Sequence, residues 1–219
     1  AISFLNQGLQ ASPKDTEILE ALGIALLKKG ESNNGIKKLL KALELEPKNP
    51  KILFNIGKAY LEISNYSDAE VFFDRLIKTQ PADFKVINNY AIALINNDKD
   101  EIAIQLLKNK ISKLGPDLDA YKLLIEALIN LELFSDSLTY SKLGNKQWPE
   151  NNEILLFLTT SYHKLKNKKK AKEGYLKLLM SDENNHSYLN KYANFLYEIG
   201  QWKEAEEWAL KLYKLDKTS

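Results

Sequence analysis

Two sets of polar residues have the types and spacing needed to hold a peptide. In each set the later residues follow the first by three, four or seven positions and so share one face of a predicted helix: Lys51, Asn55 and Lys58, and Lys85, Asn88 and Asn89. An asparagine amide both donates to and accepts from a peptide unit, and a lysine ammonium pairs with a carboxylate. The spacing favours binding of an extended peptide, although solvated polar helix faces would give the same pattern.

The other residues offer little for catalysis or metal binding. The chain has no cysteine, and its two histidines, His163 and His186, fall in different predicted helices. The sequence contains no His-x3-His pair, no glycine-rich phosphate loop and no nucleophile elbow. Acidic residues lie at lysine-pairing spacing on predicted solvent faces, as in residues 204–207 before Lys211. We therefore expect no enzyme activity, no catalytic residue, no metal and no cofactor.

The composition is that of an ordinary soluble globular protein, with 219 residues, 44% of them hydrophobic and 27% charged. A net charge of +2 arises from 31 basic and 29 acidic residues, and Arg75 is the only arginine. Because arginine is the usual residue for reading phosphates and base edges, we expect no nucleic-acid partner. No apolar run approaches the roughly 18 residues that span a bilayer, so we expect no membrane span. The sequence assigns no compartment, which leaves the cytoplasm as the default location.

The prolines reveal a period of 34 residues. Four of them are separated by 34, 34 and 68 residues, and a fifth lies one residue past Gly115, the missing member of the series: Pro13, Pro47, Pro81, Pro149 and Pro116. The period divides the chain into a leading segment and six repeats: 1–15, 16–49, 50–83, 84–117, 118–151, 152–185 and 186–219. The leading segment fits the second helix of a preceding repeat. Since no initiator methionine is present, we expect one continuous superhelical domain that is a fragment of a longer protein.

Each repeat carries two amphipathic stretches with apolar residues at i, i+3, i+4 and i+7 spacing, separated by a turn signal. In the first repeat they cover about 16–29 and 34–46, and the proline that follows ends the second stretch. A column of large apolar residues runs through the first stretches: Leu22, Ile56, Tyr90, Leu124, Leu158 and Tyr192. The next residue is small in most repeats, as at Gly23 and Gly57, which lets paired helices approach. The pattern predicts an all-α chain of twelve helices and a leading one.

At this point the chain resembles the tetratricopeptide repeat (TPR) family, whose pattern is W-x2-L-G-x2-Y, then A-x3-F, then P. The second repeat reads Leu53-x2-Ile56-Gly57-x2-Tyr60, Ala69-x3-Phe73, Pro81. The fourth repeat departs most, because Ile125 and Ser141 replace the small and the aromatic residue, so we expect looser or shifted packing there. The resemblance implies a right-handed α-solenoid of tandem 34-residue helix-turn-helix repeats.

The resemblance also implies a concave groove lined by the first helices, with the Lys/Asn residues and Lys122 facing it. Asn55, Lys85 and Asn89 stand where some members of the family hold the carboxylate of a peptide C-terminus. Glu20 and Ile24 replace the lysine and asparagine expected from the preceding repeat, so a full clamp is absent. A second, more apolar patch is expected further along the groove, where the residues could equally be covered by a neighbouring helix: Phe157, His163, Asn190, Asn194 and Tyr197.

The functional expectation is a protein-interaction scaffold that binds a peptide or partner segment in the groove. The alternative is a substrate-recruiting or regulatory domain of a larger enzyme or of a secretion or assembly machine. Self-association is a further expectation, since each repeat buries its core against its neighbours and the terminal repeats would expose stacking faces. Those faces are expected at Ile2, Phe4 and Leu9 on one side and Trp208, Leu212 and Leu215 on the other.

Overall fold

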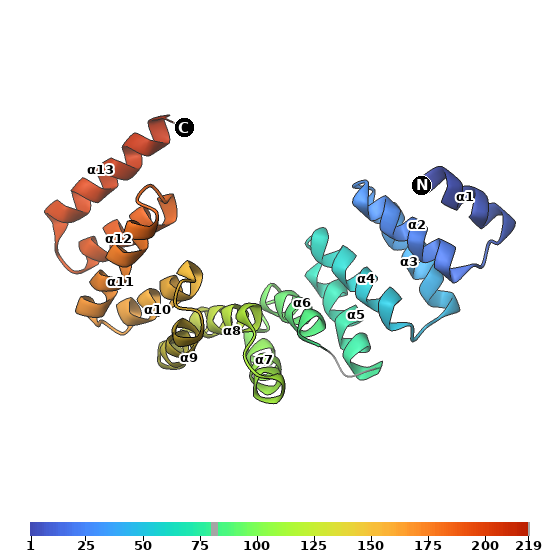
Figure 1. The fold of residues 1–219 in the computed structure, drawn as a ribbon, viewed down its shortest axis with the longest axis horizontal. Coiled ribbons are helices and arrows are strands. Elements are labelled where there is room, and N and C mark those ends of the chain that lie inside the picture. Colours follow the sequence, from blue (N-terminus) through green and yellow to red (C-terminus); the bar gives the residue numbers. More distant parts are fainter. Residues whose placement is uncertain (80–82, 219) are drawn as a thin grey trace. The chain divides into compact units, whose positions relative to one another are not determined.

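The fold is described from a computed structural model of the chain, which describes residues 1–79 and 83–218. Over these residues the structure contains thirteen helices and no strand (Figure 1). The helices are α1 (Ile2–Ala11), α2 (Thr16–Lys28), α3 (Ser32–Leu45), α4 (Pro50–Glu62), α5 (Tyr66–Thr79), α6 (Phe84–Ile95), α7 (Asp100–Leu114), α8 (Leu118–Asn130), α9 (Phe134–Gln147), α10 (Asn152–Lys164), α11 (Lys168–Ser181), α12 (His186–Glu198) and α13 (Trp202–Thr218). The predicted all-α repeat solenoid is confirmed.

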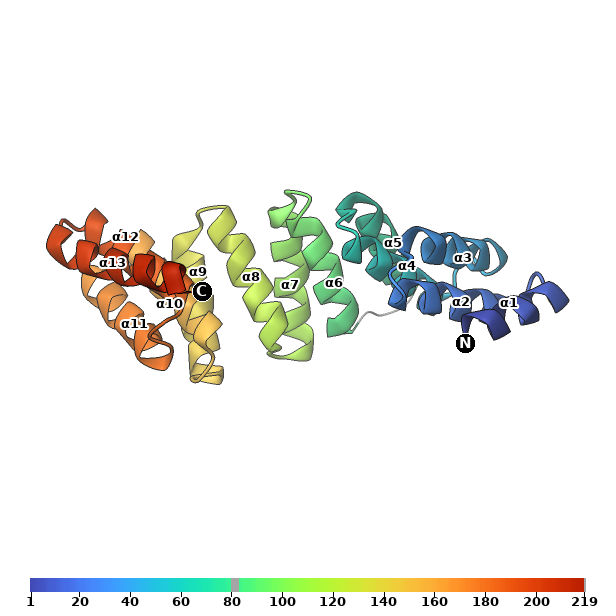
Figure 2. The same ribbon diagram turned by 90° about the horizontal axis from the view of Figure 1, so that it is seen from above.

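The chain divides into two compact units, residues 1–123 and 124–219. In the first unit α2 packs on α3, α4 on α5 and α6 on α7, and successive pairs are joined by α3 against α4 and by α5 against α6 (Figure 2). In the second unit α10 packs on both α9 and α11, and α12 packs on α11 and α13. The 34-residue pattern does not mark this division, and the repeat boundaries themselves remain a prediction.

The first helix of every repeat begins at an aspartate or asparagine that accepts a hydrogen bond from the backbone N–H three residues later. These N-cap residues recur every 34 positions: Asp15, Asn49, Asp83, Asp117, Asn151 and Asn185. Such a cap satisfies a backbone N–H that the helix leaves without a partner, and it typically stabilises a helix by about 1 kcal/mol. The caps therefore mark where each of these helices starts.

The turn inside every repeat contains one residue with a positive φ, between 56° and 86°, again at 34-residue spacing: Gly30, Ser64, Asp98, Glu132, Lys166 and Gly200. In each turn the next residue donates its N–H to a carbonyl five positions earlier, as from Asn65 to Tyr60. This hydrogen bond closes the end of a helix through one left-handed residue. Only two of the six positions are glycine, although glycine adopts this conformation at the least cost.

A proline follows four of the second helices, as expected, whereas α11 ends at Ser181 with Glu183 in place of the proline. α1, α3, α7 and α9 each end two residues before a proline. Pro81 lies outside the described residues. The last repeat has Lys217 in place of the proline, and α13 is 17 residues long and includes Lys217.

The column of small residues lies where paired helices touch. A Cβ atom added to Gly57 would lie 2.9 Å from Cζ of Phe73, and one added to Gly23 would lie 2.7 Å from Cγ of Leu39. In the fourth repeat Ile125 and Ser141 are both fully buried, so the large and the small residue have exchanged columns there. The Ser141 hydroxyl has no hydrogen-bond partner among the described residues.

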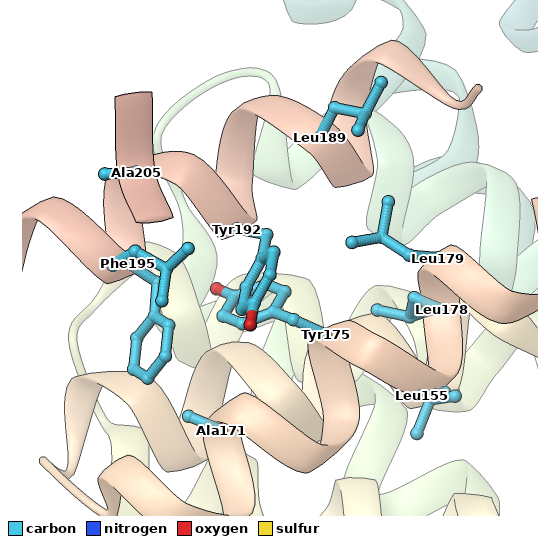
Figure 3. Close-up of a cluster of buried hydrophobic side chains, with 10 residues drawn as sticks. Leu155, Ala171, Tyr175, Leu178, Leu179, Leu189, Tyr192, Phe195 and Ala205 are labelled. Atoms are coloured by element: carbon cyan, nitrogen blue, oxygen red, sulfur yellow. The ribbon is translucent and has the colours of Figure 1, made fainter. Parts of the chain in front are cut away.

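The core of the second unit is built around Tyr175 and Tyr192, whose rings lie side by side in Figure 3. Trp208 packs edge-on against Tyr192 with ring centroids 5.3 Å apart, and Leu212 and Leu215 also pack on this cluster. The expectation that these three residues form an exposed end face is therefore wrong. They follow Ala205 at helical spacing and so share the face that α13 turns toward α12. The large apolar residues that α13 exposes are Trp202, Leu210 and Tyr213.

Candidate functional site

The predicted Lys/Asn groove begins on one side of the first unit, where α2, α4 and α6 follow one another (Figure 1). We call this side the α2–α4–α6 face. Its centre is Glu20, which is only 6% exposed and accepts hydrogen bonds from two predicted groove residues. Lys51 Nζ lies 3.1 Å from Glu20 Oε2, and Asn55 Nδ2 lies 2.9 Å from Glu20 Oε1. Lys51 and Asn55 thus join α4 to α2, and part of their hydrogen-bonding capacity is already used by Glu20.

The sequence places Glu20 in the groove as a departure from a clamp, and its pairing with Lys51 and Asn55 was not predicted. The signal that could have found its role is its distance in sequence from Lys51 and Asn55, 31 and 35 residues, which is close to one repeat. Residues one repeat apart occupy equivalent places on consecutive first helices. A buried carboxylate requires such partners, because burying a charge without a counter-charge is strongly unfavourable.

The other predicted groove lysines contact either a carboxylate or an aromatic ring. Lys58 is exposed and lies 3.6 Å from Glu62, one helical turn later. Lys85 is exposed, and its ammonium lies 4.8 Å from the centre of the Phe54 ring, a favourable cation–π contact. Lys122 is half-buried on α8, 3.6 Å from Asp119. These residues keep their charged ends at the surface.

The two asparagines of α6 face different partners. Asn89 donates to the carbonyl of Lys85 at 2.7 Å, an ordinary contact within a helix. Asn88 donates to Asp117 Oδ1 at 3.0 Å, the same carboxylate that caps α8. The structure therefore brings Asn88 into the junction with α8.

Two cavities open between consecutive first helices on the α2–α4–α6 face. The first, of about 520 Å³, lies between α2 and α4, and its lining includes Thr16, Glu17, Glu20, Asn49, Lys51 and Ile52. The second, of about 350 Å³, lies between α4 and α6, and its lining includes Pro50, Lys51, Phe54, Asp83, Lys85 and Val86. Each residue of the second series stands 34 positions after its counterpart in the first. The cavities are thus the same place in two successive repeats, and Lys51 contributes to both.

A third carboxylate, Glu46, also lines the first cavity. Its oxygens accept hydrogen bonds from Thr16 Oγ1 and, at 2.6 Å, from Asn49 Nδ2. These two hydrogen bonds hold the pKa of Glu46 below its usual value. The carboxylate is therefore ionised at neutral pH.

The predicted apolar patch of the second unit separates into two places. His163 has a side chain that is 13% exposed and lies under α12, with its Nε2 2.9 Å from Glu198 Oε2 and its ring 5.0 Å from that of Phe195. Its Nδ1 lies 3.1 Å from the Tyr175 hydroxyl. Burial raises the pKa of Tyr175 to about 12. The hydroxyl is therefore protonated at neutral pH and can donate a hydrogen bond to Nδ1. His163 is covered by a neighbouring helix.

The rest of the patch is more open. Phe157 is half-buried on α10, whereas Asn190, Asn194 and Tyr197 are exposed on α12. Asn194 donates to Asn190 Oδ1 at 3.2 Å. Asn194 and Tyr197 line a cavity of about 340 Å³ between α12 and α13, together with Trp202. Neither Phe157 nor His163 lines that cavity.

Over residues 1–79 and 83–218, no three histidine, aspartate or glutamate side chains are grouped in a way that could bind a metal ion. Within the same part of the chain, none of the helices combines the length and the apolarity that crossing a membrane requires.

Two curated relatives match nearly the whole chain. One is the BBSome complex member bbs-4 of Caenorhabditis elegans, 26% identical over 219 residues, with 98% of this chain and 46% of the relative aligned. The other is the BBSome complex member BBS4 of Bos taurus, 24% identical over 211 residues, with 94% of this chain and 40% of the relative aligned. The chain therefore spans less than half the length of these relatives.

Several solved structures share the fold. A TPR protein from Parabacteroides merdae has a TM-score of 0.83 at 13% identity and aligns over 91% of this chain and 79% of that protein. The type IV pilus biogenesis factor PilW has a TM-score of 0.76 at 15% identity, over 93% and 94%. YrrB, described as a TPR protein with an unusual peptide-binding site, has a TM-score of 0.74 at 16% identity, over 87% and 98%.

A family model described as tetratricopeptide repeat matches residues 1–114, which is more than half of the 219-residue chain. This match agrees with the helix pairs, the small residues at their contacts and the solved structures of the same fold. The chain therefore belongs to the tetratricopeptide repeat family.

Proposed function

We propose that the chain is a protein-interaction scaffold that binds an extended peptide, or an extended segment of a partner protein, along the α2–α4–α6 face. The observation that carries the proposal is the pair of cavities one repeat apart, which offers two places for side chains along one line. Peptide recognition typically combines such pockets with polar groups for the backbone. Lys58 on α4, and Lys85 and Asn89 on α6, supply polar groups at the surface.

Membership of the TPR family points to a scaffold and not to an enzyme. The two curated relatives are described as members of a complex, and this description favours a second candidate function. In that version the chain recruits a partner into a larger assembly, or regulates it, and any chemistry is carried out by other subunits or domains. The same face would then bind a segment of a fellow subunit.

A peptide selection tests the proposal. A library of random peptides displayed on phage is selected against the chain, and the enriched peptides are then measured against two variants with the same charge change. Lys85→Glu alters the α2–α4–α6 face, whereas Lys37→Glu alters an exposed position of α3. The proposal predicts enriched peptides whose affinity falls with Lys85→Glu and not with Lys37→Glu. A selection that enriches no peptide, or peptides that bind all three proteins equally, would remove this face from consideration.

Self-association of the 219-residue chain through its terminal helices is a separate proposal. It is supported by exposed aromatic side chains, since Phe4 on α1 is 77% exposed, and Trp202 and Tyr213 on α13 are 69% and 55% exposed. Light scattering over a range of concentrations tests it. A mass that rises with concentration and returns to that of the monomer with Phe4→Ser or Tyr213→Ser supports self-association, and a constant monomer mass refutes it.

A further inference from the structure

The two cavities of the α2–α4–α6 face have the same position in the repeat but opposite chemistry. The position that differs most is occupied by Glu20 in the first cavity and by Phe54, 34 residues later, in the second. A ligand that lies across both cavities therefore meets a carboxylate at one step and an aromatic ring at the next.

The first cavity is suited to a cationic side chain. Three carboxylates line it, those of Glu17, Glu20 and Glu46, against the single ammonium of Lys51, which is hydrogen-bonded to Glu20. The lining also includes Ala21 and Ile24, which provide an apolar wall. A long basic side chain matches this combination, because its methylene stem packs on apolar surface while its charged end reaches the carboxylates.

The second cavity is suited to an apolar side chain with a negative charge next to it. Its apolar lining consists of Pro50, Phe54, Leu76 and Val86. Lys51 and Lys85 both line this cavity. The ammonium of Lys85 lies over the Phe54 ring, whereas that of Lys51 is hydrogen-bonded to Glu20. The carboxylate of Asp83 is already used as the N-cap of α6, where it accepts from the N–H of Val86 at 3.0 Å.

The distance between the cavities sets the spacing of the ligand residues. α2 packs against α4 and α4 against α6, and the axes of packed helices lie about 8–10 Å apart. An extended peptide advances about 3.3 Å per residue. One repeat step therefore corresponds to about three residues of an extended ligand.

We propose that the α2–α4–α6 face selects an extended peptide in which a lysine or arginine, for the first cavity, lies about three residues from an aromatic or large aliphatic residue with an acidic neighbour, for the second. The inference rests on the proposed function and adds the chemical class of the ligand. Glu17, Glu20 and Phe54 determine the specificity at the two positions. Lys51 connects the two cavities by binding Glu20 on one side and lining the aromatic cavity on the other.

Selections against variants of the chain test the inference. Glu17→Lys reverses a charge at the mouth of the first cavity without touching the bonds of buried Glu20, and Glu44→Lys makes the same change at an exposed position of α3. With the unchanged chain and with Glu44→Lys, we expect enriched peptides to show a basic residue about three positions from an aromatic or aliphatic one. With Glu17→Lys the preference for the basic residue should disappear, while the preference for the apolar residue remains.

Affinities of one enriched peptide then measure the pairing directly. The basic residue of the peptide is replaced by glutamine, and both peptides are titrated against the chain and against Glu17→Lys. We expect Glu17→Lys to weaken the basic peptide about tenfold and the glutamine peptide by less than about twofold, since close charge pairs at interfaces couple by this order.

The outcomes separate the two proposals. Enriched peptides that depend on Lys85 but show no basic residue at the expected spacing overturn the charge-ordered ligand. Equal weakening of the basic peptide and the glutamine peptide by Glu17→Lys overturns it as well. Both results leave the proposed peptide-binding face in place. A selection that enriches no peptide overturns both.

Discussion

Two helix junctions, one in each compact unit, are packed with different chemistry. Between α4 and α5 of the first unit, Gly57 lies against the ring of Phe73, and an added Cβ atom would come within 2.9 Å of that ring. Between α9 and α10 of the second unit, the buried hydroxyls of Ser137 and Ser161 lie 2.6 Å apart. The first junction depends on close contact of apolar surfaces, and the second on a hydrogen bond between two hydroxyls that are buried from water.

The difference shows what a repeat position does and does not determine. Ser137 occupies the same column as Ala69 of the first unit, and both are fully buried, so the residue stays small while its polarity changes. The second unit also buries the Ser141 hydroxyl and the Asn145 side-chain oxygen without a partner among the described residues. Each such group costs free energy when it is removed from water. The polar junction is thus more sensitive to loss of a partner, and the apolar junction to added volume.

The largest effect is expected when volume is added to the apolar junction. Gly57→Leu places a side chain where the Phe73 ring leaves no room, so the helices must separate and the free energy of unfolding should fall by about 1–3 kcal/mol. Hydrogen exchange resolved along the sequence can assign the loss to α4 and α5, since stability in a repeat array is local. Lys58→Leu, which places the same side chain at the exposed neighbouring position, is the control. Unchanged protection of α4 and α5 in Gly57→Leu would contradict this packing.

The polar junction should respond to loss of a partner with a smaller effect. Ser161→Ala leaves the Ser137 hydroxyl buried without its hydrogen bond and should lower the free energy of unfolding by about 1 kcal/mol. The double change, Ser137→Ala with Ser161→Ala, removes both polar groups and should cost less than Ser161→Ala alone, because no hydroxyl is then left unpaired. Urea unfolding of Ser161→Ala, of Ser137→Ala alone and of the double variant measures this cycle. Simple addition of the two single effects would mean that the hydroxyls do not interact.

The turns provide a change that should stabilise the chain. Lys166 has φ 58°, whereas the equivalent turn residues Gly30 and Gly200 are glycines. A side chain in the left-handed region costs about 1 kcal/mol or more, and glycine removes most of this cost while adding some freedom to the unfolded chain. Lys166→Gly should therefore raise the free energy of unfolding by about 0.5–1 kcal/mol. Lys177→Gly, at an exposed position inside helix α11, should lower it by about the same amount. Equal destabilisation by both changes would contradict the assigned turn.

The sequence predicts the fold well because the fold depends on features that repeat. The 34-residue period, the prolines after helices and the small residues beside large ones are local signals, and they yield thirteen helices. The two stretches predicted for the first repeat, about 16–29 and 34–46, end within two residues of α2 and α3. The N-cap column was available in the same way and was missed, because it contains both aspartate and asparagine.

The candidate site was less predictable because it depends on contacts between repeats. The pairing of Glu20 with Lys51 and Asn55 requires that α2 and α4 be placed side by side. The covering of His163 depends on Glu198 of a later repeat, 35 residues away. The face that α13 presents depends on the rotation of that helix, which packs Trp208 inward on Tyr192. Residue types on a predicted helix indicate which side chains are polar, but only the neighbouring helix decides which of them remain free.

The smallest expected effect concerns a carboxylate that joins three helices of the second unit. Glu204 on α13 accepts from Lys172 Nζ of α11 at 2.8 Å and from the Tyr192 hydroxyl of α12 at 3.0 Å. The hydrogen bond from Lys172, with that from Tyr192, holds the pKa of Glu204 below the ordinary value of 4.5.

A carboxyl whose pKa is lower in the folded than in the unfolded state adds stability at pH values above its unfolded-state pKa. This stability is lost as the pH falls through the folded-state pKa. Because the side chain is 34% exposed, the contribution should stay below about 1 kcal/mol. Glu204→Gln should therefore be slightly less stable than the unchanged chain at pH 7, and the two should converge in acid below the folded-state pKa. Unfolding of both proteins by urea over this pH range measures the difference, and a gap that persists unchanged in acid would show that the ionised carboxylate does not join these helices.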